Sequence, residues 1–265
     1  KTKNRPISNP LICHFANIEE KEKNFILKDK DYELANTFWP GPLTLILEKK
    51  TNSMISPFLS NNKNQVGCRI PNNEISLSLL SIIDFPIAAP SANIATRTSV
   101  TSIDDLDYKL KEIFYIDGGS SVLGLESTVI KTTKNGCKIL RLGSLTIEDI
   151  KIKFPKYEIS IDQSDVSPGN QLKHYSPIKP IRINVDFVKK NETLLNFGIN
   201  ELASDIKSLN LSIDENLSDA SYNFYNYLNI LDSISCDGIA VAPIPNQGLG
   251  KTINDRLRRA SHKDE

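Results

Sequence analysis

The sequence predicts an α/β fold, because short apolar runs typical of strands alternate with longer amphipathic runs typical of helices. The chain has 265 residues, 39% hydrophobic and 24% charged, which is the balance of an ordinary globular protein. That length allows two cores. A polar, proline-containing stretch over 156–180 reads as an extended linker. We therefore expect an α/β domain over 1–155, a linker over 156–180 and a smaller, Rossmann-like α/β domain over 181–265.

Strands are expected where β-branched and apolar residues gather between prolines or turn residues. In the first domain they are expected at 10–14, 42–47, 85–89, 127–131 and 138–142. The run 85–89 is apolar on both faces, which is typical of a central, covered strand. In the second domain strands are expected at 181–185, 193–197 and 238–243.

Helices are expected where apolar residues recur with helical spacing. These segments are 28–38, 74–83, 145–154, 199–209 and 217–235. The prolines at 40 and 42 end the first of them. Thr146 is the expected N-cap of the third, with Glu148 near the capping-box position.

Composition narrows the class of protein. Thirty-two basic residues balance thirty-two acidic ones, so a dedicated RNA-binding module is disfavoured. The four cysteines are far apart and form no Cys-x-x-Cys pair, which argues against a zinc site or a disulfide scaffold. No run of residues is long and apolar enough to cross a bilayer, and we expect a cytoplasmic protein without a membrane partner. The chain starts at Lys1 inside a motif-like stretch, so we also expect it to be N-terminally truncated.

Several polar side chains are candidates for a site. Lys3 and Arg5 share one face of an extended segment and suit a phosphate clamp, although a solvated basic end is the alternative. His14 ends an apolar strand, where a core histidine is the commoner case. Ser91 and Asn93 follow the strand 85–89 and face the same way, either at a ligand site or in a turn.

Two arginines stand in apolar strands, Arg69 in VGCRIP and Arg141 in ILRLG. A buried guanidinium needs an anionic partner, which a structural carboxylate or a substrate could supply. The GLGKT run at 248–252 lacks the first glycine of a phosphate loop, because Pro245 stands there. The following 256–259 is expected to form the polar face of a helix.

Six segments resemble the YrdC domain in order and spacing. They are KNRP at 3–6, NPLICH at 9–14, WPGPLT at 39–44, RIP at 69–71, AAPSAN at 88–93 and ESTVI at 126–130. Further segments are similar to the linker and C-terminal domain of the two-domain, Sua5 type of threonylcarbamoyl-AMP synthase. They are SPG at 167–169, HYSP at 174–177, GLG at 248–250 and NDR at 254–256.

The resemblance implies a twisted mixed sheet with helices for the first domain, and it implies a nucleotidyltransferase. Threonine captures carbon dioxide or bicarbonate as a carbamate, which attacks the α-phosphate of ATP and expels pyrophosphate. The product serves the tRNA threonylcarbamoyltransferase machinery, with tRNA as a further partner. Mg²⁺ bound with ATP is the implied cofactor, and the protein itself supplies no metal ligands. Catalysis would rest on positioning and charge stabilisation.

The resemblance also implies roles for individual residues. Lys3 and Arg5 would be catalytic, clamping the phosphates. The ATP-binding residues would be Arg5, Asn9, Ser91, Asn93, Ser99, Arg141 and Tyr175. The threonine-binding residues would be His14, Arg69, the Ala89 backbone and Ser127. Tyr175 would reach over the nucleotide, so that the linker acts as a lid.

The sequence departs from the family pattern in a few places. The leading Pro-Thr-Glu-Thr-Val-Tyr-Gly motif is absent, Asn4 replaces a glycine, and Leu142 stands where proline is usual. Three alternatives stay open. They are a non-catalytic RNA- or nucleotide-binding module, a YrdC domain of a carbamoyl-transfer maturation enzyme, and an inactive fragment.

Overall fold

A computed structural model describes residues 3, 5–6, 9–60, 63–162 and 175–262. The described residues form two compact units, each with its own sheet. The eight-stranded unit takes its residues from 5–90 and 126–162, and the four-stranded unit takes Lys3, 91–125 and 175–262. Each unit is therefore built from segments that are separated in the sequence.

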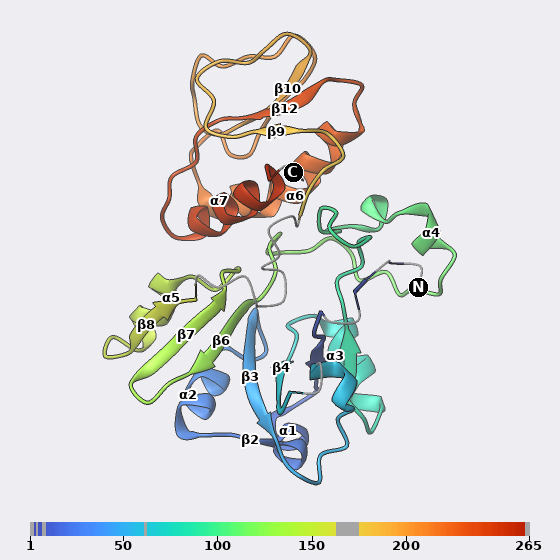
Figure 1. The fold of residues 1–265 in the computed structure, drawn as a ribbon, viewed down its shortest axis with the longest axis vertical. Coiled ribbons are helices and arrows are strands. Elements are labelled where there is room, and N and C mark those ends of the chain that lie inside the picture. The colour runs from blue at the N-terminus through green and yellow to red at the C-terminus, as the bar shows by residue number, and fades with distance from the viewer. Residues whose placement is uncertain (1–2, 4, 7–8, 61–62, 163–174, 263–265) are drawn as a thin grey trace. The chain divides into compact units, whose positions relative to one another are not determined.

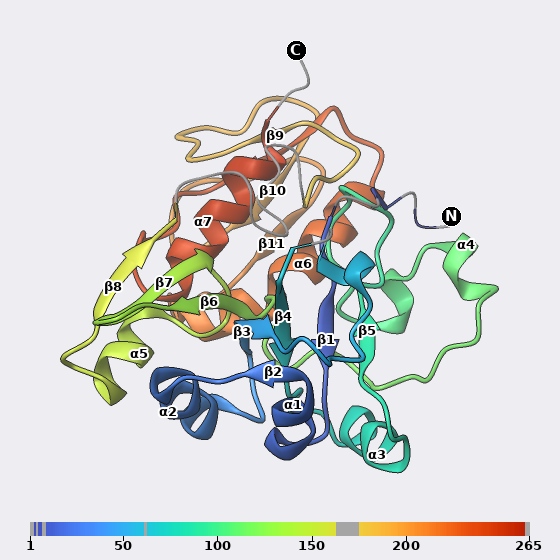
Figure 2. The same ribbon diagram turned by 60° about the horizontal axis from the view of Figure 1, so that its bottom comes forward.

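The eight-stranded unit contains a mixed sheet with the order β5-β1-β4-β3-β6-β7-β8, and β2 pairs with β3. Figure 1 shows the part of this sheet from β4 to β8, and the whole order can be followed in Figure 2. The strands are β1 (Ile12–His14), β2 (Phe25–Ile26), β3 (Leu43–Lys49), β4 (Gln65–Arg69), β5 (Ile87–Ala89), β6 (Thr128–Thr132), β7 (Gly136–Arg141) and β8 (Glu158–Ile161). β1 and β4 run parallel, as do β3 and β6, whereas β3 runs antiparallel to β4 and β6 antiparallel to β7. This register brings the ends of β1, β4 and β7 and the starts of β3 and β6 to one edge of the sheet.

Helices cover this sheet and close its core. They are α1 (Ile18–Asn24), α2 (Asp29–Phe38), α3 (Glu74–Ile82) and α5 (Ile147–Lys153), and α1, α2 and α3 lie along one face in Figure 2. Fully buried side chains of β3, α2 and α5, including Leu45, Leu34 and Ile150, belong to one hydrophobic cluster. Burial of this apolar surface is the main force that holds the unit together.

The four-stranded unit contains a parallel sheet with the order β11-β10-β12-β9. Its strands are β9 (Ile181–Arg182), β10 (Glu192–Asn196), β11 (Ser208–Asn210) and β12 (Gly238–Val241), and its helices are α4 (Tyr108–Lys111), α6 (Leu217–Ser233) and α7 (Leu249–Ala260). Phe224, Leu228 and Leu257 contribute to its core from α6 and α7. The parallel strands confirm the small Rossmann-like α/β unit expected from the sequence.

Most of the expected elements are present, and α2 ends at Phe38 just before the prolines. The capping box of α5 is formed by Thr146 and Asp149, because Asp149 rather than Glu148 occupies the third helical position. Two expectations are wrong. The run 85–89 is not central, since β5 (Ile87–Ala89) ends the sheet and pairs with β1. No helix forms over 199–209, where Ser208–Asn210 is instead a strand. Within the segment expected to be a linker, Glu158–Ile161 forms β8, which pairs with β7.

The structure does not test every expectation drawn from the sequence. Positions 163–174, with the SPG segment and His174, lie outside the described residues. The expected domain boundaries stay a prediction, since compactness groups 91–125 with the C-terminal residues. None of the helices in the described ranges is long and apolar enough to span a bilayer.

Candidate functional site

Four of the predicted site residues lie at one edge of the eight-stranded sheet. His14 and Arg69 end the neighbouring strands β1 and β4 and are register partners. Ser127 precedes β6, and Arg141 ends β7. Because each residue lies at a strand end, its position is set by the hydrogen-bonded register of the sheet.

Ser127 is held from two sides. It is 3% exposed, and its Oγ lies 2.8 Å from Thr44 Oγ1 of β3. The Nη2 of Arg141 donates to the Ser127 carbonyl oxygen at 2.7 Å and to Ser127 Oγ at 3.1 Å, and Arg141 Nε donates to the same carbonyl at 3.2 Å. Ser127, Thr44 and Arg141 therefore form one hydrogen-bonded polar group.

Arg69 lies in the same part of the site. Its Nε donates to the Gly41 carbonyl oxygen at 2.9 Å, just before β3. Burial, followed by repulsion from Arg141, lowers the pKa of Arg69 from 12.5 to about 10. The two arginines are thus partly buried cations that repel each other.

The sequence predicts an anionic partner for each of these arginines. Within the described ranges, no carboxylate lies within ion-pair distance of Arg69 or Arg141. Their observed partners are backbone carbonyls and Ser127. Among the residues that the structure describes, both guanidinium groups are therefore held by neutral oxygen atoms.

His14 stands beside Arg69 as a neutral imidazole. Burial, followed by the charge of Arg69, lowers the pKa of His14 from 6.5 to about 4. Its Nδ1 is buried and has no hydrogen-bond partner among the described residues. Hydrogen bonds with the backbone of Ile87 and Ile12 act in the opposite direction on this pKa but are outweighed by burial and by Arg69.

The remaining predicted residues of this unit lie toward the other end of β1. Arg5 Nη2 donates to the carbonyl oxygens of Asn9 and Pro10, at 3.3 and 2.7 Å. Ala89 pairs with Ile12, two residues before His14. One three-residue strand, β1, separates this group from His14 and Arg69, a span of roughly 7–10 Å.

The other predicted residues belong to the four-stranded unit, and three of them touch. Lys3 Nζ donates to the Asn93 backbone carbonyl and to Asn93 Oδ1, and Ser91 Oγ donates to Asn93 Oδ1 at 2.5 Å. Asn93 is 4% exposed, and its Nδ2 donates to the Arg97 carbonyl oxygen at 2.7 Å. The structure thus brings together Lys3, Ser91 and Asn93, as a local turn network that includes a lysine.

Ser99 and Tyr175 are both buried in the four-stranded unit, at 8% and 2% exposure. The Ser99 carbonyl accepts from Asn229 Nδ2 at 3.5 Å. The Tyr175 ring belongs to the hydrophobic cluster of α6 and α7, with its centroid 6.1 Å from that of Tyr225. Tyr175 is therefore an integral part of the core of this unit.

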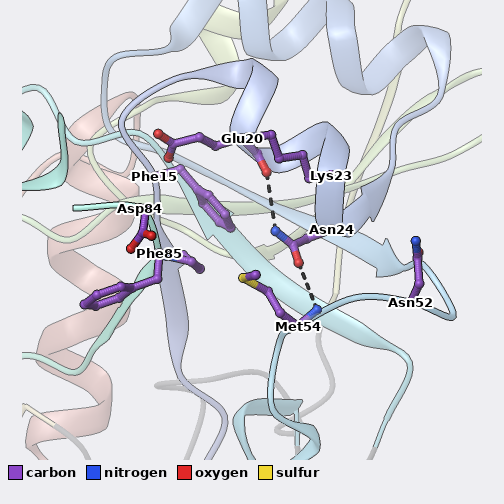
Figure 3. A pocket seen from close by; sticks show the side chains of 9 residues that line it. Phe15, Glu20, Lys23, Asn24, Asn52, Met54, Asp84 and Phe85 are labelled. Atoms are coloured by element: carbon purple, nitrogen blue, oxygen red, sulfur yellow. Dashed lines mark hydrogen bonds between the residues drawn. The ribbon is translucent and has the colours of Figure 1, made fainter. Parts of the chain in front are cut away.

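Two cavities are lined by other residues. One, of about 270 Å³, lies in the eight-stranded unit (Figure 3). Around it are Phe15, Met54 and Phe85, and Met54 N donates to Asn24 Oδ1 at 3.1 Å. Another, of about 620 Å³, is lined in the four-stranded unit by Arg97, Ser176 and neighbouring residues. None of the residues predicted to bind ATP or threonine lines either cavity.

Two residues beside Ser127 were not predicted from the sequence as site residues. Thr44 touches Ser127, and its place in the WPGPLT segment was the available signal. Gly143 lies so close to the strand start that a Cβ would be 2.4 Å from the Glu126 carbonyl oxygen. A single glycine in a polar loop carries no sequence signal for such an approach.

The chain matches two protein families over almost its whole length. Residues 1–143 match a family described as "Telomere recombination" (Sua5_yciO_yrdC), and residues 145–262 match "Threonylcarbamoyl-AMP synthase, C-terminal domain". A threonylcarbamoyl-AMP synthase of Pyrococcus abyssi is 32% identical over 98% of this chain and 82% of its own length. The chain belongs to the Sua5-type threonylcarbamoyl-AMP synthase family.

Other comparisons agree with this membership of the Sua5-type family. A threonylcarbamoyl-AMP synthase of Bacillus subtilis is 30% identical over 98% of this chain and 82% of its own length. A crystal structure of P. abyssi Sua5 complexed with L-threonine superposes with a TM-score of 0.82 at 30% identity, covering 98% of this chain and 82% of that one. The family and the fold expected from the sequence motifs are thereby confirmed.

Proposed function

We propose that this Sua5-type protein is an L-threonylcarbamoyladenylate synthase. It forms threonylcarbamoyl-AMP and pyrophosphate from L-threonine, bicarbonate or carbon dioxide, and ATP. Supporting this proposal, relatives matched over nearly the whole chain carry the name threonylcarbamoyl-AMP synthase, and P. abyssi Sua5 has been crystallised with L-threonine. The product would pass to the machinery that modifies tRNA, in the cytoplasm.

The arginines Arg69 and Arg141, with Ser127 between them in the strand order, give the main structural support for this function. Both arginines have fixed positions and lack a carboxylate partner in the described ranges. An arginine side chain can hold a carboxylate through two parallel hydrogen bonds. Arg69 is therefore assigned to the threonine carboxylate and Arg141 to the nucleotide, where its charge would oppose the growing negative charge at the α-phosphate.

The rest of the threonine site is assigned to His14, Ser127 and the Ala89 backbone. Neutral His14 adds no charge that would repel the threonine ammonium. The ammonium first loses one proton to water, the amine nitrogen then bonds to the carbon of carbon dioxide, and the nitrogen loses a second proton to water to give the carbamate. The resulting carbamate oxygen then attacks the α-phosphorus, and the bond to pyrophosphate breaks.

ATP is assigned to Lys3, Arg5, Asn9, Ser91, Asn93, Ser99 and Tyr175, with Lys3 and Arg5 on the phosphates. Mg²⁺ would enter with ATP. The described ranges hold no group of three acidic, histidine or cysteine side chains arranged for a metal ion, so its ligands would come from the phosphate oxygens and water. Its role would be to neutralise charge on the phosphates of the leaving group.

The test is release of pyrophosphate from ATP, Mg²⁺ and bicarbonate, with and without L-threonine, by this chain and by the complete product of its gene. Mass spectrometry should detect threonylcarbamoyl-AMP in the threonine reaction. Serine and valine are matched controls, since each lacks one of the two groups on the threonine β-carbon. Absence of threonine-dependent release from the complete gene product would overturn the proposal.

A further inference from the structure

Arg256 is a fully buried arginine on α7 that the predicted site does not include. It is 0% exposed, although the sequence suggested the polar face of a helix for 256–259. Its Cζ lies 4.5 Å from the centroid of the Tyr175 ring. A guanidinium at this distance from a ring is attracted to the negative π-face, and the attraction is larger where water is excluded.

The acid beside Arg256 pairs with more than one arginine of the same helix. Arg256 Nη1 lies 2.5 Å from Asp255 Oδ2, but the same carboxylate also binds Arg259 Nε at 3.1 Å. One carboxylate is therefore shared between two well-buried cations. The face of Tyr175 supplies further electrostatic stabilisation for Arg256.

The backbone of Tyr175 is fixed as well as its ring. Its φ of 62° lies in the left-handed region, which bulky residues seldom adopt. Immediately after it, Ser176 N donates to the Thr96 carbonyl oxygen at 2.9 Å, and Ser176 forms a parallel bridge with Arg97. Tyr225 of α6 contacts the ring from the same hydrophobic cluster.

We propose that Arg256 is a positioning residue for nucleotide binding, acting through Tyr175. This inference rests on the proposed function, in which Tyr175 contacts ATP. Arg256 holds the Tyr175 ring in one orientation, and Thr96 holds the following residue beside the segment that carries Ser91, Asn93 and Ser99. The C-terminal domain thereby contributes to the affinity for ATP and not to that for threonine.

The residue type matters to this role. A guanidinium is planar and can lie against an aromatic face while its edge hydrogen-bonds to a carboxylate, whereas an ammonium is a compact point charge. Lysine at position 256 would retain the charge but not the planar guanidinium group. The variants Arg256→Lys and Arg256→Met therefore separate the two contributions. Arg258→Met is the matched control, because Arg258 also pairs with Asp255, at 3.9 Å, but its side chain is 68% exposed, whereas that of Arg256 is buried against the Tyr175 ring.

The experiment measures KM for ATP, KM for threonine and kcat of the complete gene product. Arg256→Met should raise KM for ATP about tenfold, the size expected for a desolvated cation–π contact, and leave KM for threonine within about twofold. Arg256→Lys should give an intermediate KM for ATP, and Arg258→Met should match the unsubstituted protein. Adding Arg256→Met to Tyr175→Ala should cause no further rise, because the two residues act through one contact.

The outcomes that overturn the inference are distinct from failure of the proposed function. An unchanged KM for ATP in folded Arg256→Met would overturn it, as would additive effects in the double variant. Loss of folding in both Arg256 variants, seen by circular dichroism, would assign the side chain to stability alone and also overturn it. If the proposed function fails, the unsubstituted protein itself shows no threonine-dependent release of pyrophosphate.

Discussion

Arg69 and Arg141 repel each other at one edge of the eight-stranded sheet, yet backbone carbonyls rather than carboxylates hold both. Arg69 donates to Gly41 and Arg141 to Ser127. Proximity of Arg141 adds to burial in lowering the pKa of Arg69. Like charges held together in this way cost free energy that a bound anion recovers, so the arrangement is suited to binding more than to stability.

Replacing Arg69 should therefore impair activity without weakening the fold. Arg69→Gln removes the proposed partner of the threonine carboxylate, and we expect kcat/KM for threonine to fall about a hundredfold, the order expected for a charge-assisted hydrogen bond of 2–3 kcal/mol. The free energy of unfolding in urea should stay the same or rise. Arg258→Gln, on an exposed arginine, is the control and should change neither quantity. A large loss of stability with normal threonine kinetics would identify Arg69 as a structural residue instead.

Gly143 is predicted to keep Ser127 in place. A Cβ at position 143 would lie 2.4 Å from three backbone atoms of 126–128, and backbone cannot move aside as a side chain can. Gly143→Ala should thus displace the strand start, destabilise the protein by about 1–3 kcal/mol and lower kcat/KM for threonine. Gly67→Ala is a milder comparison, because its nearest contact would be the Thr44 side chain at 3.2 Å. Equal stability of the two variants would contradict the role given to Gly143.

Local rules were enough to predict many elements of the fold. The proline pair sets the end of α2 at Phe38, and Thr146 caps α5 as its side chain type predicts. Those local rules did not predict which strands pair with each other. The run 85–89 has the composition of a covered strand, but its position at the sheet edge depends on pairing with the distant β1. The absence of a helix at 199–209 likewise reflects the pairing of Ser208–Asn210 with β10.

For the candidate site, too, the sequence predicted the residues but not the contacts that they make. The motifs pointed to His14, Arg69, Ser127 and Arg141, and the strand register explains why these four meet. Backbone carbonyl oxygens hold Arg69 and Arg141 in the structure. A sequence pattern could not predict this, because every residue has a backbone carbonyl. Arg256 likewise looked like a surface residue, although its burial follows from the ring that packs against it.

Lys21 should destabilise the protein at neutral pH. It is 0% exposed, its Nζ has no hydrogen-bond partner among the described residues and lies 3.7 Å from the Trp39 ring centroid. Burial lowers the pKa of Lys21 from 10.5 to about 7. Lys21→Met should therefore raise the free energy of unfolding by roughly 1–4 kcal/mol at pH 7, by analogy with buried ionic groups replaced by apolar ones.

The pH dependence provides a second check on Lys21. Between pH 7 and 10.5 the unfolded chain binds the proton that the folded lysine has lost, so this residue makes stability rise with pH over that window. Urea unfolding at pH 7 and pH 9 should show this rise in the unsubstituted protein and a smaller one in Lys21→Met. A stabilising contribution of the Trp39 contact that outweighs burial would instead make the variant less stable at both pH values.

His14 should also make stability depend on pH, but in an acidic pH range. Its pKa is about 4 in the folded protein and 6.5 in the unfolded chain, so below pH 6.5 the unfolded chain binds a proton that the folded protein rejects. The contribution of His14 to stability is thus fully present above pH 6.5 and is lost as the pH falls toward 4, by up to about 3 kcal/mol. His14→Gln retains a polar side chain that does not titrate. The difference in unfolding free energy between the two proteins, measured in urea at pH 7.5, 6.0 and 5.0, should shift steadily against the unsubstituted protein as the pH falls. A difference that is constant across these pH values would show that His14 titrates normally and is accessible to water, and the neutral imidazole assigned to the threonine site would then have to be abandoned.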